Sequence, residues 1–319
     1  MTHSQNSPID TDGIDRRGML ECMAWVGTGL VWSVTGGIAS SRAFGRPAAL
    51  DKKATFTFVQ ISDSHLGFGK EPYKDVAATL KATVAKINAL PEPPAFVLHT
   101  GDLTHLAKPE EFDAVAEILK GVKAGAVGYV PGEHDFDGDG NKEYLKRYGK
   151  NTQGLGWYSF DNKGVHFIGL VNVADAKSGS GAGGLGVIGK EQLEWLKKDL
   201  AGLKDSTPIV VFAHVPLWTV HEKWGWGTRD SEQALDMLKR FGSVTVLNGH
   251  IHQVLQKVEG KVTFHTARST AFPQSEPGKG TPGPVRDLPA GKLKSVLGLT
   301  TVSYVENPGS LAIVDSTLE

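Results

Sequence analysis

The chain has almost no cysteine: Cys22 is the only one among 319 residues. It lies within the first 43 residues, which we interpret below as an export signal, so the mature protein would have none. Such a chain can form no disulfide and cannot use a cysteine nucleophile or a thiolate-rich zinc site. Its stability must come from a hydrophobic core, which about 275 residues can readily supply.

The chain also lacks an excess of charge of one sign. Lys and Arg number 34 against 35 Asp and Glu, and the formal net charge is -1. Nucleic-acid binding depends largely on neutralising phosphates with basic side chains, so this composition argues against a dedicated nucleic-acid binder. There is no internal repeat, and a hydrophobic content of 40% is typical of an ordinary globular domain.

The N-terminal segment predicts export. Arg16 and Arg17, in the sequence DRRGML, resemble a twin-arginine motif, and an uncharged stretch over residues 22–41 follows. We expect residues 1–43 to be a signal that the twin-arginine machinery reads and that is then cleaved, which makes the protein periplasmic or secreted. An uncleaved membrane anchor is the alternative, but the many Gly, Ser and Thr residues disfavour it. Once the signal is cleaved, we expect no stable membrane span.

Five short clusters of carboxylates and imidazoles follow, each directly after an apolar segment that predicts a buried strand. The strands are expected at about 57–61, 96–98, 127–130, 209–213 and 244–247. Ligands at strand ends converge on one edge of a sheet, where an open α/β fold builds its site. The clusters are Asp63-Ser64-His65, Gly101-Asp102, Gly132-Glu133-His134-Asp135, His214 and Gly249-His250-Ile251-His252.

In order and spacing, the clusters from about Thr55 to Val254 resemble those of the calcineurin-like metallophosphoesterases. The resemblance implies an α/β fold: a four-layer α-β-β-α sandwich of two mixed sheets flanked by helices, here as one domain over residues 44–319. It also implies two divalent or trivalent metal ions and hydrolysis of a small-molecule phosphoester by a metal-bridging hydroxide. Mixed imidazole and carboxylate ligands favour iron, manganese or zinc over magnesium or calcium.

The resemblance also gives the clustered residues individual roles. The expected ligands of the first ion are Asp63, His65, Asp102 and His252. Those of the second ion are Asp102, Glu133, His214 and His250, so that Asp102 is a bidentate bridge between the ions. The histidine of the third cluster, His134, would face the substrate and assist the leaving group. The neighbouring Asp135 would orient its ring and raise its basicity.

Glu133 departs from the family pattern, which usually has Asn at this position. A carboxylate binds metal more strongly than an amide, but it adds a negative charge and donates no hydrogen bond when ionised. This charge would favour a more highly charged pair of metal ions, or would disfavour a dianionic phosphomonoester relative to a monoanionic phosphodiester. We therefore expect a phosphodiesterase. A phosphomonoesterase, such as an acid phosphatase or nucleotidase, and a non-catalytic metal or phosphate-binding module are the alternatives.

Further candidates lie near the clusters. His105, three residues after Asp102, would contact either the substrate or the metal ligands. The tryptophans of the loop after His214 would form an apolar wall for the organic part of the substrate, or would simply be packed. Arg229 would bind phosphate or form a surface ion pair. The three tryptophans are Trp218, Trp224 and Trp226.

Other histidines and two glycine-rich segments have simpler interpretations. His99, His166 and His265 lie in apolar strands and are expected in the core. Residues 184–190 mimic a phosphate-binding loop, but Glu191 stands where Ser or Thr is needed. Residues 135–140 mimic a calcium loop, but Lys146 takes the place of the required glutamate.

The remaining pattern alternates helices and strands. Helical spacing of apolar residues predicts helices at 73–89, about 109–120, 141–148, 190–200 and 231–240. Strands at 157–161 and 164–170 flank a hairpin turn, and strands near 300–305 and 311–314 would finish the second sheet. Residues 272–289 are rich in Pro and Gly and predict a long loop.

Overall fold

The computed structural model describes residues 29–35, 38–44, 54–136, 141–173, 184–289, 291–306 and 310–319. The chain divides into two units, residues 1–53 and 54–319. In the first unit, β1 (Gly29–Thr35) pairs antiparallel with β2 (Ile38–Phe44). The expected twin-arginine motif and Cys22 lie outside the described residues. Among the described residues, none of the helices has the length and apolar character needed to cross a membrane.

The second unit contains a first sheet of five strands. Its order is β13-β12-β3-β4-β5, with β3, β4 and β5 parallel and the two C-terminal strands antiparallel. The expectation that the C-terminal strands finish the second sheet is wrong, because β12 pairs directly with β3. The strands are β3 (Phe56–Ile61), β4 (Val97–His99), β5 (Val127–Tyr129), β12 (Gly298–Val305) and β13 (Ser310–Thr317).

The second sheet has six strands in the order β10-β11-β9-β8-β7-β6. Its four inner strands are parallel, and each edge strand joins by an antiparallel hairpin. The strands are β6 (Tyr158–Asn162), β7 (Val165–Gly169), β8 (Ile209–Phe212), β9 (Val244–Asn248), β10 (Gln256–Glu259) and β11 (Val262–Thr266).

The two sheets pack face to face through an aromatic core. Phe58 of β3 meets Phe167 of β7 edge to face, with ring centroids 5.4 Å apart, and both side chains are fully buried. Full burial of such a side chain contributes about 1.5–3 kcal/mol. Val210 and Phe212 of β8 belong to the same core. These apolar side chains thus point from their strands into the layer between the two sheets.

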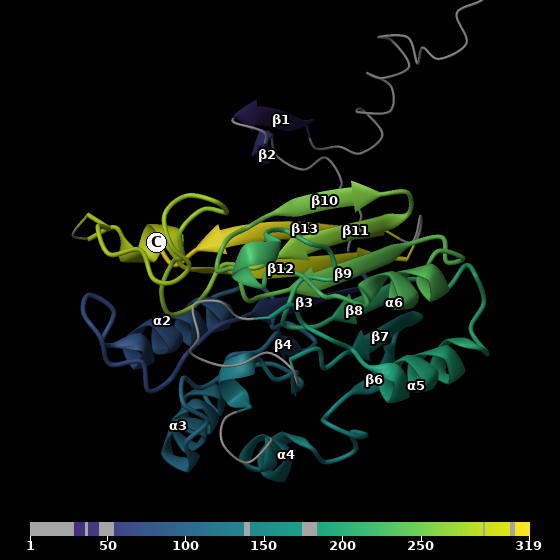
Figure 1. Ribbon diagram of the computed structural model, residues 1–319, viewed down its shortest axis with the longest axis horizontal. Helices are drawn as coiled ribbons and strands as arrows, with labels where there is room; N and C mark the ends of the chain where they lie inside the picture. Colours follow the sequence, from purple (N-terminus) through teal and green to yellow (C-terminus); the bar gives the residue numbers. More distant parts are fainter. Residues whose placement is uncertain are drawn as a thin grey trace, which may run out of the picture. The chain divides into compact units, whose positions relative to one another are not determined.

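Helices cover the outer face of each sheet (Figure 1). Val59 and Ile61 of β3 pack with the first group of helices, and Val211 and Val246 pack with the second group. The expected four-layer α-β-β-α sandwich is therefore confirmed. The first group is α2 (Val76–Asn88), α3 (Pro109–Leu119) and α4 (Lys142–Tyr148); the second is α5 (Lys190–Leu200) and α6 (Ser231–Leu238); a short α7 (Leu293–Val296) precedes β12.

Buried histidines add polar links within this core. His265 of β11 lies 3.0 Å from a carboxylate oxygen of Asp315 on β13, so the pair joins the two sheets. Burial alone would raise the pKa of Asp315, but the hydrogen bond and charge of His265 outweigh it and lower that pKa. His99 and His166 are buried as well, as expected. Burial lowers the pKa of His99 to about 3.

Candidate metal centre

The structure brings the five clusters together, and the backbone of most of the ligand positions is unusual. Five of the seven expected ligands have positive φ angles, between 43° and 68°. Residues other than glycine rarely adopt this left-handed conformation and keep it only where the surrounding structure holds it. His250 and His252 are therefore not part of an extended strand. The five ligands are Asp63, His65, Asp102, His250 and His252.

The first group of ligands is Asp63, His65 and His252, which are all buried. Their donor atoms lie within 4.8 Å of one another. Oδ1 of Asp63 is 3.3 Å from Nε2 of His252, and Nε2 of His65 is 3.2 Å from the same nitrogen. Two imidazole nitrogens at this distance need a proton or a metal ion between them, because two lone pairs repel.

The second group is Glu133, His214 and His250. One carboxylate oxygen of Glu133 lies 2.9 Å from Nε2 of His214, and the other lies 2.9 Å from Nδ1 of His250. The two imidazole nitrogens are 3.3 Å apart. The carboxylate of Glu133 therefore lies inside the ligand group, where the sequence pattern placed it.

Asp102 lies between the two groups. Its Oδ2 is 3.5 Å from Nε2 of His65 and 3.3 Å from Nε2 of His214. Its Oδ1 instead accepts a hydrogen bond of 2.9 Å from the backbone N–H of His134. Oδ2 therefore faces both groups, while Oδ1 is held by the backbone of His134; the bidentate bridge stays a prediction.

Backbone carbonyls fix the tautomers of two ligand histidines. Nδ1 of His252 lies 2.6 Å from the carbonyl oxygen of Phe272, and Nδ1 of His214 lies 2.7 Å from that of Thr100. A carbonyl can only accept, so each Nδ1 carries the proton and each Nε2 presents a lone pair to the centre. Such partners orient metal ligands and raise their basicity. Neither carbonyl was identified from the sequence.

The electrostatics of the centre fit bound cations. Burial would raise the pKa of Asp63, but the imidazoles of His252 and His214 hold it at about 2. Three ligand carboxylates and four imidazoles share one small region, and this donor set suits iron, manganese or zinc. These residues would hold two metal ions, with Asp102 between the two ligand groups.

Asp135 does not orient the ring of His134 as expected, although its charge is among those that raise the pKa of His134. Its two carboxylate oxygens accept hydrogen bonds from the backbone N–H groups of Gly132, Leu103 and Thr104, at 2.9–3.0 Å. The ring of His134 is held instead by the carbonyl oxygen of His105, 2.8 Å from Nδ1. Asp135 therefore shapes the loops that carry the ligands, and a backbone carbonyl orients His134.

Two glycines in the clusters leave space for ligand side chains from other strands. A Cβ atom on Gly132 would lie 2.0 Å from Oδ1 of Asp102. One on Gly249 would lie 1.9 Å from Oγ of Ser62 and 2.7 Å from Oδ2 of Asp63. Glycine is needed at both positions because the loop that carries it passes directly against a metal-ligating side chain of another loop.

His105 lies beside the centre and contacts two of its histidines. Its ring stacks on that of His134, with centroids 4.6 Å apart and an interplanar angle of 21°. Its Nδ1 is 3.4 Å from Nδ1 of His65. Burial and the neighbouring His134 lower the pKa of His105 to about 4, so the ring is neutral near pH 7. Of the two roles considered for His105, the structure shows contact with a metal ligand.

Two aromatic residues that the sequence did not reveal close one side of the centre. Phe272 stacks on His65 at 4.8 Å and contacts His252 at the same distance. Phe68 packs against Phe272 at 4.5 Å and meets the edge of His105 at 5.0 Å. Phe272 begins the Pro- and Gly-rich loop, so that loop starts at the metal centre. In the sequence, only the position of Phe68, three residues after the expected ligand His65, indicated that either aromatic residue lies near the centre.

The tryptophan loop is largely packed rather than open. Trp226 is only 2% exposed, so it cannot line a substrate site without rearrangement. Trp218 packs against Phe264 of the core, with centroids 5.1 Å apart. Trp224 contacts the edge of Trp226 and is partly exposed. Arg229 is exposed. The wall of three tryptophans is therefore wrong for Trp226, which supports the loop itself.

The glycine-rich segment before α5 is not an anion site. Its amides at Ile188 and Gly189 donate to the carboxylate of Asp230, at 2.9 and 2.8 Å. A phosphate would have to displace this carboxylate, which agrees with the interpretation from the sequence. The segment that mimics a calcium loop, residues 135–140, includes residues 137–140, which lie outside the described part of the chain.

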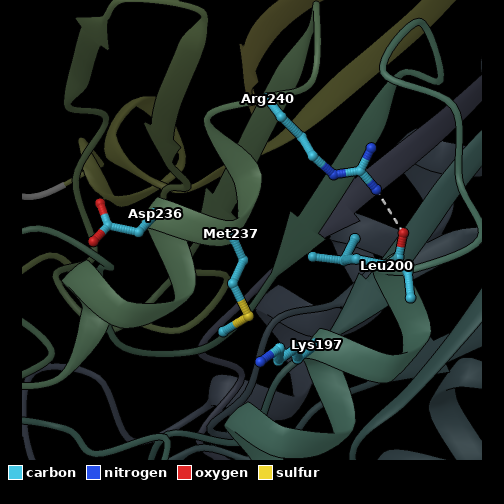
Figure 2. Close-up of a pocket in the computed structure, with 6 residues that line it drawn as sticks. Lys197, Leu200, Asp236, Met237 and Arg240 are labelled. Carbon is cyan, nitrogen blue, oxygen red and sulfur yellow. Dashed lines mark hydrogen bonds between the residues drawn. The ribbon is translucent and has the colours of Figure 1, made fainter.

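A hollow of about 240 Å³ lies between α5 and α6 in the outer helical layer (Figure 2). Arg240 at its rim donates to the carbonyl oxygen of Leu200, at 2.6 Å. Lys197, Asp236 and Met237 also line it. Its single carboxylate is held 2.5 Å from Nζ of Lys239, so it offers no set of metal-ligating groups.

Comparison with known proteins gives consistent matches. A family model described as "Calcineurin-like phosphoesterase" matches residues 56–254. The protein named "Probable glycerophosphodiester phosphodiesterase GpdQ" of Arcobacter nitrofigilis is 28% identical over 225 residues, covering 66% of this chain and 77% of its own length. A "Probable cyclic nucleotide phosphodiesterase" of Rhodopseudomonas palustris is 24% identical, covering 67% and 78%. The structure of a dimetal phosphatase from Danio rerio has a TM-score of 0.58 at 16% identity, covering 84% of this chain and all of that one.

Proposed function

Because this chain belongs to the calcineurin-like phosphoesterase family and is a metal-dependent phosphoric ester hydrolase, we propose that its substrate is a small-molecule phosphodiester. The relatives named as a glycerophosphodiester phosphodiesterase and a cyclic nucleotide phosphodiesterase support this class. They match about two thirds of this chain. The proposal itself depends on the chemistry of this chain's own centre.

The observation that carries the proposal is the carboxylate of Glu133 inside the second ligand group. Its oxygens lie 2.9 Å from nitrogens of both His214 and His250, and its side chain is 13% exposed. With Asp63 and Asp102, it gives the centre three negative ligands. At an effective dielectric constant of about 20, two like charges about 6 Å apart repel by about 3 kcal/mol. A phosphomonoester carries one more negative charge than a diester and is therefore disfavoured.

The residues of the chain divide the remaining work. When bound, the two metal ions activate a water molecule and neutralise charge on the phosphate oxygens. The Nδ1–H of His134 donates to the carbonyl oxygen of His105, so Nε2 remains to hold a proton for the departing alkoxide. The backbone carbonyls that accept from Nδ1 of His214 and His252 keep the Nε2 lone pairs of these histidines directed at the centre.

The test is hydrolysis, with manganese added, of paired chromogenic phosphate diester and monoester substrates. We expect the diester to be preferred and His252→Ala to reduce turnover to background. Glu133→Gln has nearly the same size but lacks the charge, so it should shift the ratio towards the monoester by about ten- to a hundredfold. A wild-type preference for the monoester would make the protein a phosphomonoesterase. Absence of turnover with manganese, iron and zinc would indicate a binding module.

We also propose that the protein is exported by the twin-arginine machinery and acts in the periplasm or outside the cell. The support is the Arg16-Arg17 pair and the uncharged segment that follows it. The full-length chain should be found in the periplasmic fraction, shortened at the N-terminus. Replacing both arginines with lysine should keep it in the cytoplasm, and equal export of the variant would contradict the proposal.

A further inference from the structure

Glu111 is a buried carboxylate that the reaction described above does not use. It lies in the first turn of α3 and is 7% exposed. Its Oε2 accepts a hydrogen bond of 2.8 Å from the backbone N–H of Leu106. It also accepts a longer one of 3.3 Å from the N–H of His105, which donates at 2.9 Å to the carbonyl oxygen of Leu66 as well. A Cβ atom on Gly67 would lie 2.1 Å from its Oε1. The carboxylate is therefore enclosed between the loop of His105 and the loop that follows ligand His65.

His105, whose loop is held by Glu111, contacts both the candidate proton donor His134 and the expected ligand His65. The carbonyl oxygen of His105 accepts from Nδ1 of His134, and the His105 ring stacks on the His134 ring. The same ring lies 3.4 Å from Nδ1 of ligand His65. A shift of the His105 backbone would move the acceptor that orients His134.

The loop that carries His105 needs an external support. Ala107 within it has a φ angle of 53°, a conformation that alanine seldom adopts unless its surroundings hold it there. Hydrogen bonds from backbone N–H groups to an ionised carboxylate are stronger than those between neutral groups. Glu111 accepts one such bond from Leu106, immediately before the left-handed position, and shares the N–H of His105 with the carbonyl oxygen of Leu66.

We propose that Glu111 is a positioning residue for His134, acting through the His105 peptide. The N–H of Leu106 and the carbonyl of His105 belong to one planar peptide. By accepting that N–H, Glu111 fixes the carbonyl that sets the direction of the His134 ring. The inference rests on the proposed function, in which His134 supplies a proton to the leaving group. It adds a residue that touches neither metal nor substrate but determines whether that proton is delivered.

The proposal predicts a dependence on the leaving group. A 4-nitrophenolate leaves without a proton, whereas an alkoxide requires one in the transition state. A displaced His134 should therefore impair hydrolysis of an alkyl diester and leave that of a nitrophenyl diester nearly intact. A general loss of folding or of metal would lower both rates together.

The experiment uses the full-length, metal-loaded protein and measures kcat and KM for a nitrophenyl diester and a glycerophosphodiester. Glu111→Ala should lower kcat for the glycerophosphodiester about ten- to a hundredfold, and kcat for the nitrophenyl diester less than about threefold, with little change in KM. Glu111→Gln keeps one acceptor oxygen and should lie between wild type and Glu111→Ala. The matched control is Glu110→Ala, which removes an exposed carboxylate from the same helical turn and should behave as wild type.

Metal content and thermal midpoint are measured for each variant. Equal losses on both substrates, the same effect in Glu110→Ala, or a loss that follows metal content would overturn the proposal. If Glu111→Ala does not fold, Glu111→Gln decides by the same substrate ratio. If wild type hydrolyses neither diester, the proposed function fails. If wild type hydrolyses both and the Glu111 variants keep its substrate ratio, only the role of Glu111 fails.

Discussion

Gly132→Ala tests whether the close contact between two ligand loops is needed for the metal centre. The backbone of Gly132 is extended, with φ -98° and ψ 178°, a conformation that alanine adopts without strain. The added Cβ would nevertheless lie 2.0 Å from Oδ1 and 2.3 Å from the backbone nitrogen of Asp102. Any effect must therefore come from this contact.

The size of the effect follows from what has to move. The backbone nitrogen of Asp102 cannot rotate away as a flexible side chain could, so the ligand loop must shift by about 1 Å to restore van der Waals contact. Forcing extra volume into a packed region typically costs about 1–3 kcal/mol. In a domain of this size, that should lower the thermal midpoint by about 3–10 °C. The shift also moves the ligand oxygen that faces both metal groups.

The assay compares Gly132→Ala with Gly202→Ala, a matched control whose added Cβ would meet nothing within 4 Å. Metal content per chain, thermal midpoint in a chelator and diester hydrolysis are measured for both. We expect the control to match wild type and Gly132→Ala to bind fewer than two ions and lose hydrolysis. Full metal binding by Gly132→Ala with an unchanged midpoint would refute the reasoning.

Three further predictions concern stability. Asp315→Asn should lower the free energy of unfolding by about 1–3 kcal/mol, measured with urea, because it weakens the link to His265. Since the pKa of Asp315 is lowered in the folded chain, the difference from wild type should shrink as the pH falls through that value. His166 lies 2.9 Å from Asp199, and its pKa is raised in the folded chain. Protonated His166 therefore adds to the free energy of unfolding, fully below about pH 6.5 and no longer at higher pH. His166→Gln should differ from wild type in stability more at pH 6 than at pH 9. Trp226→Ala should lower stability by about 3–5 kcal/mol with unchanged KM, and a raised KM in a stable variant would restore the tryptophan to the substrate wall.

Much of the architecture was predictable because apolar runs and helical periodicity report burial directly. The strands before Asp63 and Asp102 and the helix at 190–200 appear where the pattern placed them. The helix expected at 73–89 begins later, because the side chain of Asp75 accepts from the N–H of Ala78 and caps it there. The C-terminal strands were placed in the wrong sheet, since strand pairing depends on partners far away in the sequence.

The supports of the site were harder to predict. A backbone carbonyl can come from any residue, so nothing in the sequence marks Phe272 or His105 as the acceptor for a histidine. Asp135 was assigned to its neighbour His134 because carboxylates commonly orient imidazoles, but the fold surrounds it with backbone N–H groups instead. Glu111 looked like an ordinary acidic residue in the first turn of a helix.

The sequence by itself determined the metal-ligating residue types, their order after buried strands and the replacement of the usual Asn by Glu133. Side-chain chemistry and local periodicity are properties of the chain and can be read from it. Only the tertiary structure decided that one oxygen of Asp102 faces both metal groups, that Trp226 is buried and that Glu111 holds the His105 loop. These depend on which distant loops meet at the sheet edge, and packing of the two sheets and their helices sets that arrangement.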